Sequence, residues 1–175
     1  MNAKKKIALL VGNMHTYFPQ KMVSEIIKAC DKRNVDLVTY AGMESSQFFI
    51  GDNATHDDFD YQYMSIYDYV HYTKVDAIVI LYGSITTFQD IPDKNKFFQK
   101  FDGIPIICLE ERVPADRGIS ILMDNQQAIF EATTHLIEHG RKHILFLSGP
   151  AHNLEAGERL HGYMLAMQAA GMHWD

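Results

Sequence analysis

The side chains best suited to bind a ligand gather in one polar segment, between an apolar run at 143–147 and an amphipathic stretch at 154–170. The segment and the start of that stretch hold small, amide-bearing and charged residues, namely Ser148, Gly149, His152, Asn153, Glu155 and Arg159. The flanking patterns predict a buried strand before this segment and a helix after it. Because ligands of open α/β sheets bind outside the carboxyl ends of the strands, we expect a binding site here.

Three of the candidate residues have both a ligand-binding and a structural interpretation. The guanidinium of Arg159 could bind ligand hydroxyls or a carboxylate. It could instead form an ion pair with Glu155 or Glu158 on the same helix, and the residues alone favour the ion pair. Tyr17 and Phe18 follow the first apolar run. They could stack on a ligand, or one of them could pack against the next helix, and the sequence favours neither.

The pattern His135-Leu136-Ile137-Glu138-His139 matches the inverted zinc-protease signature H-x-x-E-H. It would place two imidazoles one turn apart on a helix, but no third ligand is evident downstream. Surface histidines near a helix C-terminus, where positive charge is favourable, explain the pattern better. The chain has no Walker loop, no G-x-G-x-x-G pattern and no G-x-S-x-G elbow. We therefore predict no catalytic residue, no metal and no cofactor.

Composition indicates an ordinary globular protein without a nucleic-acid surface. Hydrophobic residues make up 47% of the 175 residues, charged residues make up 22%, and the net charge is −6. Cys30 and Cys108 lie in apolar segments without a C-x-x-C partner, so we expect reduced thiols in the core. No apolar run is long enough for a signal peptide or a membrane span. These features predict a cytoplasmic protein with no membrane partner.

Apolar runs and helix-period stripes alternate along the chain, which predicts an α/β fold with a parallel sheet. The expected strands are 6–12, 35–41, 76–82, 104–109, 119–123 and 143–147, and the expected helices are 20–32, 61–73, 93–101, 125–139 and 154–170. A long polar loop is expected at 42–60 and a Ser/Thr loop at 83–90. Asp124 has the side chain of a helix N-cap.

The count of elements predicts two lobes of unequal completeness. Residues 1–123 can form a complete doubly wound parallel-sheet lobe. Residues 124–175 can form only a first helix–strand–helix unit of a second, similar lobe. A strand as apolar as 143–147 needs a sheet to join, so we expect this chain to be the first part of a longer two-lobe protein.

Several motifs resemble the LacI/GalR family of sugar- and purine-responsive transcription regulators. They are Asp124-Asn125, HLIEHGRKHI at 135–144, Ser148-Gly149-Pro150, ERLHGY at 158–163, Ala166-Met167 and Gly171, with IALLVGNMHTYFPQKMVSEI at the start. The resemblance is to the ligand-binding region of that family, which has the type I periplasmic-binding-protein fold. It implies two lobes that close on an effector in the cleft between them, and side-by-side homodimers.

The resemblance also implies ligand-binding roles for particular residues. Tyr17 and Phe18 match the stacking aromatics, and Arg159 matches an arginine that contacts ligand hydroxyls. Asn153, which is an arginine in some members, falls at a polar contact position. The full expected set is Asn13, Tyr17, Phe18, Glu110, Asp124, Asn153, Glu155 and Arg159.

Our leading hypothesis is a non-enzymatic sensing domain of a LacI-type regulator, which binds a sugar-like metabolite and signals closure to an output domain. No helix-turn-helix precedes Lys6, so DNA binding would need a domain outside this chain. One alternative is a sensor fused to a diguanylate cyclase or a histidine kinase. Another is a doubly wound metal-dependent enzyme that uses His135 and His139.

Overall fold

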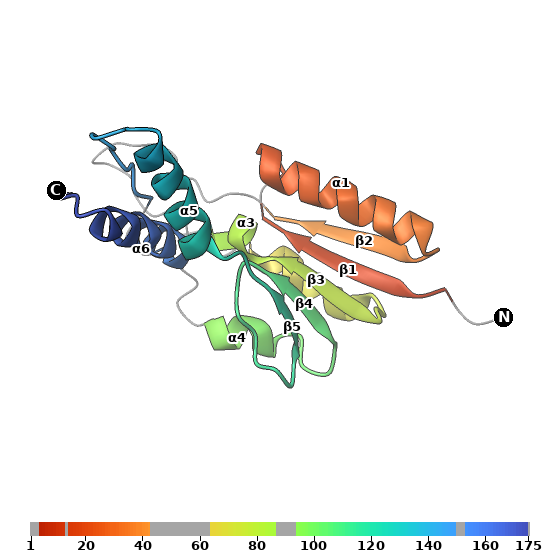
Figure 1. Ribbon diagram of the computed structural model, residues 1–175. Coiled ribbons are helices and arrows are strands. Elements are labelled where there is room, and N and C mark those ends of the chain that lie inside the picture. Colours follow the sequence, from red (N-terminus) through yellow and green to blue (C-terminus); the bar gives the residue numbers. More distant parts are fainter. Residues whose placement is uncertain (1–3, 13, 43–63, 87–93, 150–152, 175) are drawn as a thin grey trace, which may run out of the picture. The chain divides into compact units, whose positions relative to one another are not determined.

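The computed structural model describes residues 4–12, 14–42, 64–86, 94–149 and 153–174 (Figure 1). The chain divides into two compact units, unit 1 at Met1–Leu122 and unit 2 at Met123–Asp175. The loop expected at 42–60 lies outside the described residues except for Gly42. None of the helices that the structure describes is long and apolar enough to cross a membrane.

Unit 1 contains a five-stranded parallel sheet in the order β2-β1-β3-β4-β5 (Figure 1). Its strands are β1 (Lys6–Val11), β2 (Asp36–Ala41), β3 (Ala77–Leu81), β4 (Ile106–Leu109) and β5 (Gly118–Ile121). This confirms the expected doubly wound α/β lobe and its five strands. The strand order reverses between β1 and β3, which makes their carboxyl ends the topological switch point where such sheets bind ligands.

Alternate residues of the central strands form two hydrophobic cores, one on each face of the sheet. On one face Leu10 and Ile80 pack with aromatic residues of η2 (Ile66–Tyr72) and α4 (Lys94–Gln99). On the other face Leu9 and Leu81 pack against α1 (Tyr17–Lys32). Strands buried on both faces are apolar throughout, which is why their positions could be predicted from sequence.

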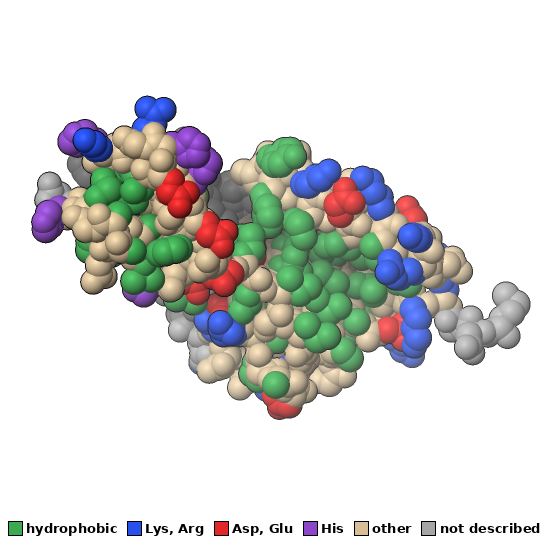
Figure 2. All heavy atoms as spheres, viewed as in Figure 1, with side chains coloured by type: hydrophobic (Ala, Val, Ile, Leu, Met, Phe, Trp, Pro, Cys, Tyr) green, Lys and Arg blue, Asp and Glu red, His purple; other side chains and the backbone are tan. Residues whose placement is uncertain are grey.

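The face of the sheet that carries α1 is covered unevenly. Ile119 and Ile121 of β5 are 63% and 53% exposed, and Figure 2 shows hydrophobic side chains gathered on unit 1 beside α1. A patch of this kind on a small unit is a candidate contact surface.

Two predictions about unit 1 need correction. Residues 66–72, inside the helix expected at 61–73, form a 3-10 helix, and its buried side chains are Tyr67 and Val70. Residues 83–86, expected in a loop, belong to the short helix α3 (Tyr82–Thr86). Ser84 lies inside this helix and is buried, with 8% of its surface exposed.

Unit 2 consists of α5 (Asn125–Glu138), α6 (Leu154–Ala169) and the segment that joins them. Asp124 caps α5 as predicted, since its carboxylate accepts a hydrogen bond from the Gln127 N–H at 3.0 Å. The helices approach closely at Gly162, where an added Cβ would lie 2.2 Å from the Gln126 carbonyl oxygen. Only a glycine therefore permits this helix contact.

The strand expected at 143–147 is not formed, so this prediction was wrong. No strand neighbours it among the described residues of unit 2, and a strand is defined by its pairing. Its side chains still alternate: Leu145 and Leu147 are each 85% exposed, whereas Phe146 stacks on Tyr163 with ring centroids 5.1 Å apart. The Tyr163 hydroxyl donates to the Ile144 carbonyl at 2.9 Å and holds the segment on α6.

Replacement of Gly162 tests the close helix contact. Gly162→Ala is expected to lower the free energy of unfolding of unit 2 by about 1–3 kcal/mol, because the backbones must separate to admit the methyl group. Gly157→Ala is the matched control: apart from its chain neighbours and the nearby backbone of its own helix, no atom lies within 4 Å of its added Cβ, and better helix propensity adds up to about 1 kcal/mol. Urea unfolding followed by circular dichroism measures both, and equal effects of the two variants would contradict the assignment.

The reactivity of the Cys108 thiol tests how tightly the core of unit 1 is packed. Both cysteines are free and buried, as predicted, and burial raises the pKa of the Cys108 thiol from 9.0 to about 12. The folded state thus holds this proton more tightly, so the associated stability is present below pH 9 and is lost as the pH rises toward 12. In a Cys30→Ala background, the remaining thiol is expected not to react with a disulfide reagent at about pH 8 until the protein is unfolded. Rapid reaction of the native protein would show that the site is open.

Candidate functional site

The carboxyl ends of β1, β3 and β4 bring together three segments of unit 1. Gly12 follows β1, α3 follows β3, and Glu110 follows β4. Parallel strands end at the same edge of a sheet, so these segments are neighbours although they are distant in sequence. This edge is the candidate site of unit 1.

Gly12 and Ser84 join two of these segments. The Gly12 N–H donates to the Ser84 Oγ at 3.0 Å, and the same hydroxyl donates to the Leu81 carbonyl at 2.6 Å. An added Cβ at Gly12 would lie 2.1 Å from the Ser84 carbonyl oxygen. The end of β1 is therefore in direct backbone contact with α3.

The Val11 carbonyl, at the end of β1, accepts two further hydrogen bonds. The Tyr67 hydroxyl donates to it at 3.1 Å, and the Gly42 N–H donates at 2.8 Å. Tyr67 is 1% exposed, and burial raises the pKa of its phenol. A neutral, fixed hydroxyl therefore holds this end of the strand.

The structure places Tyr17 and Phe18 in the first turn of α1, which begins three residues before the helix expected at 20–32. Thr16 is the N-cap residue of that helix. The two rings are 79% and 43% exposed, so Tyr17 does not serve mainly to pack the helix. Asn13, the other candidate in this segment, lies outside the described residues.

Glu110 has a left-handed backbone, with φ of +69°. A residue with a long side chain rarely adopts this conformation, and such strain is found at functional sites. Its carboxylate lies against Gly83, where an added Cβ would be 2.2 Å from Oε2. Its N–H donates to the Ile121 carbonyl at 3.0 Å, which fixes the turn between β4 and β5.

In unit 2 the predicted residues Glu155 and Arg159 form an ion pair, with 3.7 Å between Nη1 and Oε2. The same Nη1 donates to the Asn125 side-chain oxygen at 3.0 Å. Asn125 is 7% exposed, and its amide nitrogen donates to Glu158 at 3.2 Å. The ion pair favoured from the residues alone is thus present, while the Arg159 side chain stays 35% exposed.

The other two candidates of unit 2 act as helix caps. Asp124 caps α5, and the Asn153 side-chain oxygen accepts a hydrogen bond from the Ala156 N–H at 2.9 Å to cap α6. Each cap uses one oxygen acceptor. The second carboxylate oxygen of Asp124 and the amide nitrogen of Asn153 are the atoms that a ligand could use.

His135 in the last turn of α5 and His139, the C-cap residue of that helix, have ring centroids 4.1 Å apart. His139 Nδ1 is 2.9 Å from the His135 carbonyl oxygen, so that nitrogen serves the helix end. Over the part of the chain that the structure describes, no three His, Cys, Asp or Glu side chains form a metal-binding group. The two imidazoles alone do not make a structural or catalytic zinc site.

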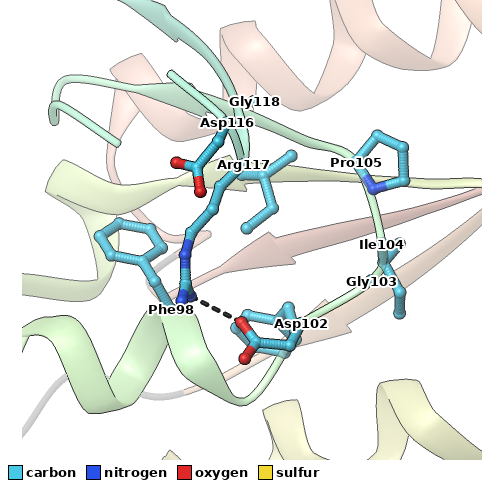
Figure 3. Close-up of a pocket in the computed structure, with 10 residues that line it drawn as sticks. Phe98, Asp102, Gly103, Ile104, Pro105, Asp116, Arg117 and Gly118 are labelled. Carbon is cyan, nitrogen blue, oxygen red and sulfur yellow. Dashed lines mark ion pairs between the residues drawn. The ribbon is translucent and has the colours of Figure 1, made fainter. Parts of the chain in front are cut away.

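A pocket of about 380 Å³ lies at the opposite edge of unit 1, beside the amino ends of β4 and β5 (Figure 3). Phe98, Phe101 and Ile104 line its apolar part, and Arg117 pairs with Asp102 across it at 2.7 Å. None of the predicted site residues lines it. The ion pair satisfies Arg117 and Asp102, and Asp116 also lines the pocket.

A doubly wound parallel sheet with polar and aromatic groups at its carboxyl edge defines a class of ligand-binding α/β proteins. Within that class, the family described as periplasmic binding proteins and sugar binding domain of LacI family matches residues 4–175. The chain belongs to this family, which confirms the resemblance seen in its motifs.

The chain is similar to transcription regulators in sequence and in structure. An HTH-type transcriptional regulator of Lachnoclostridium phytofermentans is 31% identical over 96 residues, which are 55% of this chain and 28% of that protein. The Escherichia coli transcriptional repressor ascG has a TM-score of 0.69 at 20% identity, over 98% of this chain and 56% of that one. A transcriptional regulator CelR–cellobiose complex has a TM-score of 0.68 at 22% identity, over 98% and 49%. The chain therefore spans about half the length of these solved chains.

Sequence reasoning missed three residues that hold the candidate residues in place, Ser84 and Tyr67 in unit 1 and Asn125 in unit 2. The bonds of the first two join residues 72 and 56 positions apart, and Asn125 bonds to Arg159 over 34 positions. A pattern of neighbouring residues cannot predict hydrogen bonds between residues so far apart in the sequence. The one available signal was a polar residue at a strand end or helix start, which Ser84 and Asn125 both satisfy.

Loss of Asn125 tests the network of unit 2. Asn125→Ala is expected to lower the free energy of unfolding by about 1–3 kcal/mol, because Glu158 and Arg159 lose a buried partner. Gln127→Ala is the control on the same helix, since it removes an exposed side-chain hydrogen bond to Glu131 and should change stability by no more than about 0.5 kcal/mol. Denaturant titration compares them, and equal values would mean that Asn125 has no special role.

Proposed function

We propose that this chain is the effector-sensing part of a LacI-type transcription regulator, and that it binds a small polar metabolite such as a sugar. The family membership of residues 4–175 carries the proposal. The solved relative that is titled as a cellobiose complex supports a sugar as the class of effector. The aromatic, carboxylate and guanidinium groups described above are suited to such a ligand.

Sugars present apolar ring faces and hydroxyl edges, and the candidate residues offer a group for each. In our proposal the exposed rings of Tyr17 and Phe18 stack on the apolar face. Glu110 accepts hydrogen bonds from hydroxyls, and Arg159 donates to them. Asn13, Asp124, Asn153 and Glu155 complete the proposed set. Binding by groups of both units would couple the effector to their relative movement, which is how we propose a signal reaches an output domain.

The partners and compartment follow from the same proposal. We infer a homodimer that acts on DNA only through a domain outside residues 1–175 and that catalyses no reaction itself. The sequence and structural relatives named above are transcription regulators, so a cytoplasmic location is expected. Stoichiometric zinc in the purified protein would favour the alternative of a metal-dependent enzyme.

Thermal unfolding of the full-length protein with a panel of monosaccharides, disaccharides and nucleosides tests the proposal. An effector at one hundred times its Kd adds about 2.7 kcal/mol to the stability of the folded state, which is about 5–10 °C in Tm for a domain of this size. If no sugar in the panel raises the Tm, the sugar-sensing proposal fails. A response to nucleosides alone would change the effector class.

Two tyrosine variants locate the binding site once an effector is found. Tyr17→Ala is expected to weaken binding about tenfold, because a stacking ring contributes on the order of 1 kcal/mol or more. Tyr72→Ala is the control, since this ring is 85% exposed on η2 and belongs to no candidate site. Calorimetric titration of both variants measures the Kd. Equal affinities would remove Tyr17 from the site.

A further inference from the structure

We propose that Ser84 is a positioning residue for the aromatic part of the effector site. Its hydroxyl holds Gly12, where the segment that leads from β1 to Tyr17 and Phe18 begins. This inference rests on the proposed function, because the two rings are the effector contacts proposed above. Ser84 itself need not contact the effector.

The Ser84 hydroxyl uses its donor and one acceptor position at once. It accepts from the Gly12 N–H at 3.0 Å and donates to the Leu81 carbonyl at 2.6 Å. Ser84 is 8% exposed, so water has little access to replace either bond. One side chain therefore ties the ends of β1 and β3 together at the topological switch point.

The backbone contact beneath this bond leaves Gly12 no room to move toward α3. An added Cβ at Gly12 would lie 2.1 Å from the Ser84 carbonyl oxygen and 2.7 Å from the Ile85 Cα. A side chain at this position would push the segment away from α3. Since Tyr17 follows only five residues later and begins α1, we expect a displacement at Gly12 to reach the first turn of that helix.

The same short helix also contacts the acidic candidate. Gly83, next to Ser84, leaves the space in which the Glu110 carboxylate lies. Helix α3 thus touches the segment before the rings through Ser84 and the carboxylate through Gly83. This arrangement makes α3 the shared support of both groups in unit 1.

The alternative is that α1 positions the rings by its own packing. Val23 of α1 is 5% exposed and belongs to the core on that face of the sheet. If this packing suffices, removal of the Ser84 hydroxyl leaves the first turn of α1 and effector binding unchanged. The two explanations therefore predict different results.

The experiment compares Ser84→Ala with the unchanged protein by amide exchange and by titration with the sugar found in the thermal panel. We expect the Gly12 amide to exchange at least about tenfold faster and the Kd to rise about tenfold, because a buried N–H loses its acceptor. Ser84→Thr and Ser84→Val form a second pair of equal volume that differs only in the hydroxyl. We expect the Ser84→Thr variant to retain most of the affinity for the sugar and the Ser84→Val variant to lose it. This pair gives a clear result even if the alanine variant is unstable.

Tyr40→Phe is the control for a general loss of stability. It removes the 2.6 Å hydrogen bond between Tyr40 and Thr73, which lies in the same unit and involves neither Gly12 nor Ser84. The Tyr40→Phe variant should leave the amide exchange rate of Gly12 and the Kd for the sugar unchanged. Unchanged exchange and Kd in Ser84→Ala would overturn the inference, as would equal effects of the Thr and Val variants. If the unchanged protein binds no sugar, the proposed function fails, and Gly12 exchange still decides whether Ser84 positions this segment.

Discussion

Close contact between Gly12 and α3 is the constraint on which the carboxyl edge of unit 1 depends. A parallel sheet covered on both faces leaves its strand ends as the place where side chains can meet a ligand. At that edge the Val11 carbonyl and the Gly12 N–H are both bonded, to Tyr67 and to Ser84. Because these groups are buried and satisfied, the segment after β1 begins from a fixed point. The exposed rings that follow can then be held in place without losing their accessibility.

Unit 2 meets a different constraint, since no strand pairing is described there and it depends on one helix contact. Gly162 lets α5 and α6 approach to backbone distance, and Asn125 is held between Arg159 and Glu158. The caps at Asp124 and Asn153 then place both helix starts. The polar groups of the predicted site are therefore also the groups that begin the helices. Any substitution at these two positions would therefore alter helix stability, whatever its effect on ligand binding.

Local pattern was sufficient for the five strands of the sheet and for helices α1, α4, α5 and α6, and it failed where a structure depends on partners far away in the sequence. Buried parallel strands are continuous apolar runs, so β1, β3 and β4 could be read directly. The run at 143–147 has the same character and forms no strand, because pairing depends on a neighbour that the pattern cannot show. Tyr17 and Arg159 became candidates because of their residue types and because of the family resemblance, and their ligand-binding roles stay predictions. Ser84 and Asn125 were missed because their roles come from partners far away in sequence.

Arg159 shows why a structural and a ligand-binding role need not compete. Its guanidinium carries five donors, and the bonds to Asn125 and the ion pair with Glu155 both involve Nη1. These contacts already restrict the Arg159 side chain to few rotamers in the absence of a ligand. Ordering this side chain on binding would therefore cost less conformational entropy. An arginine that was free in solution would have to be ordered by the effector itself. In the function proposed above, the ion pair that the residues alone favoured would also preorganise the arginine for a hydroxyl-bearing ligand.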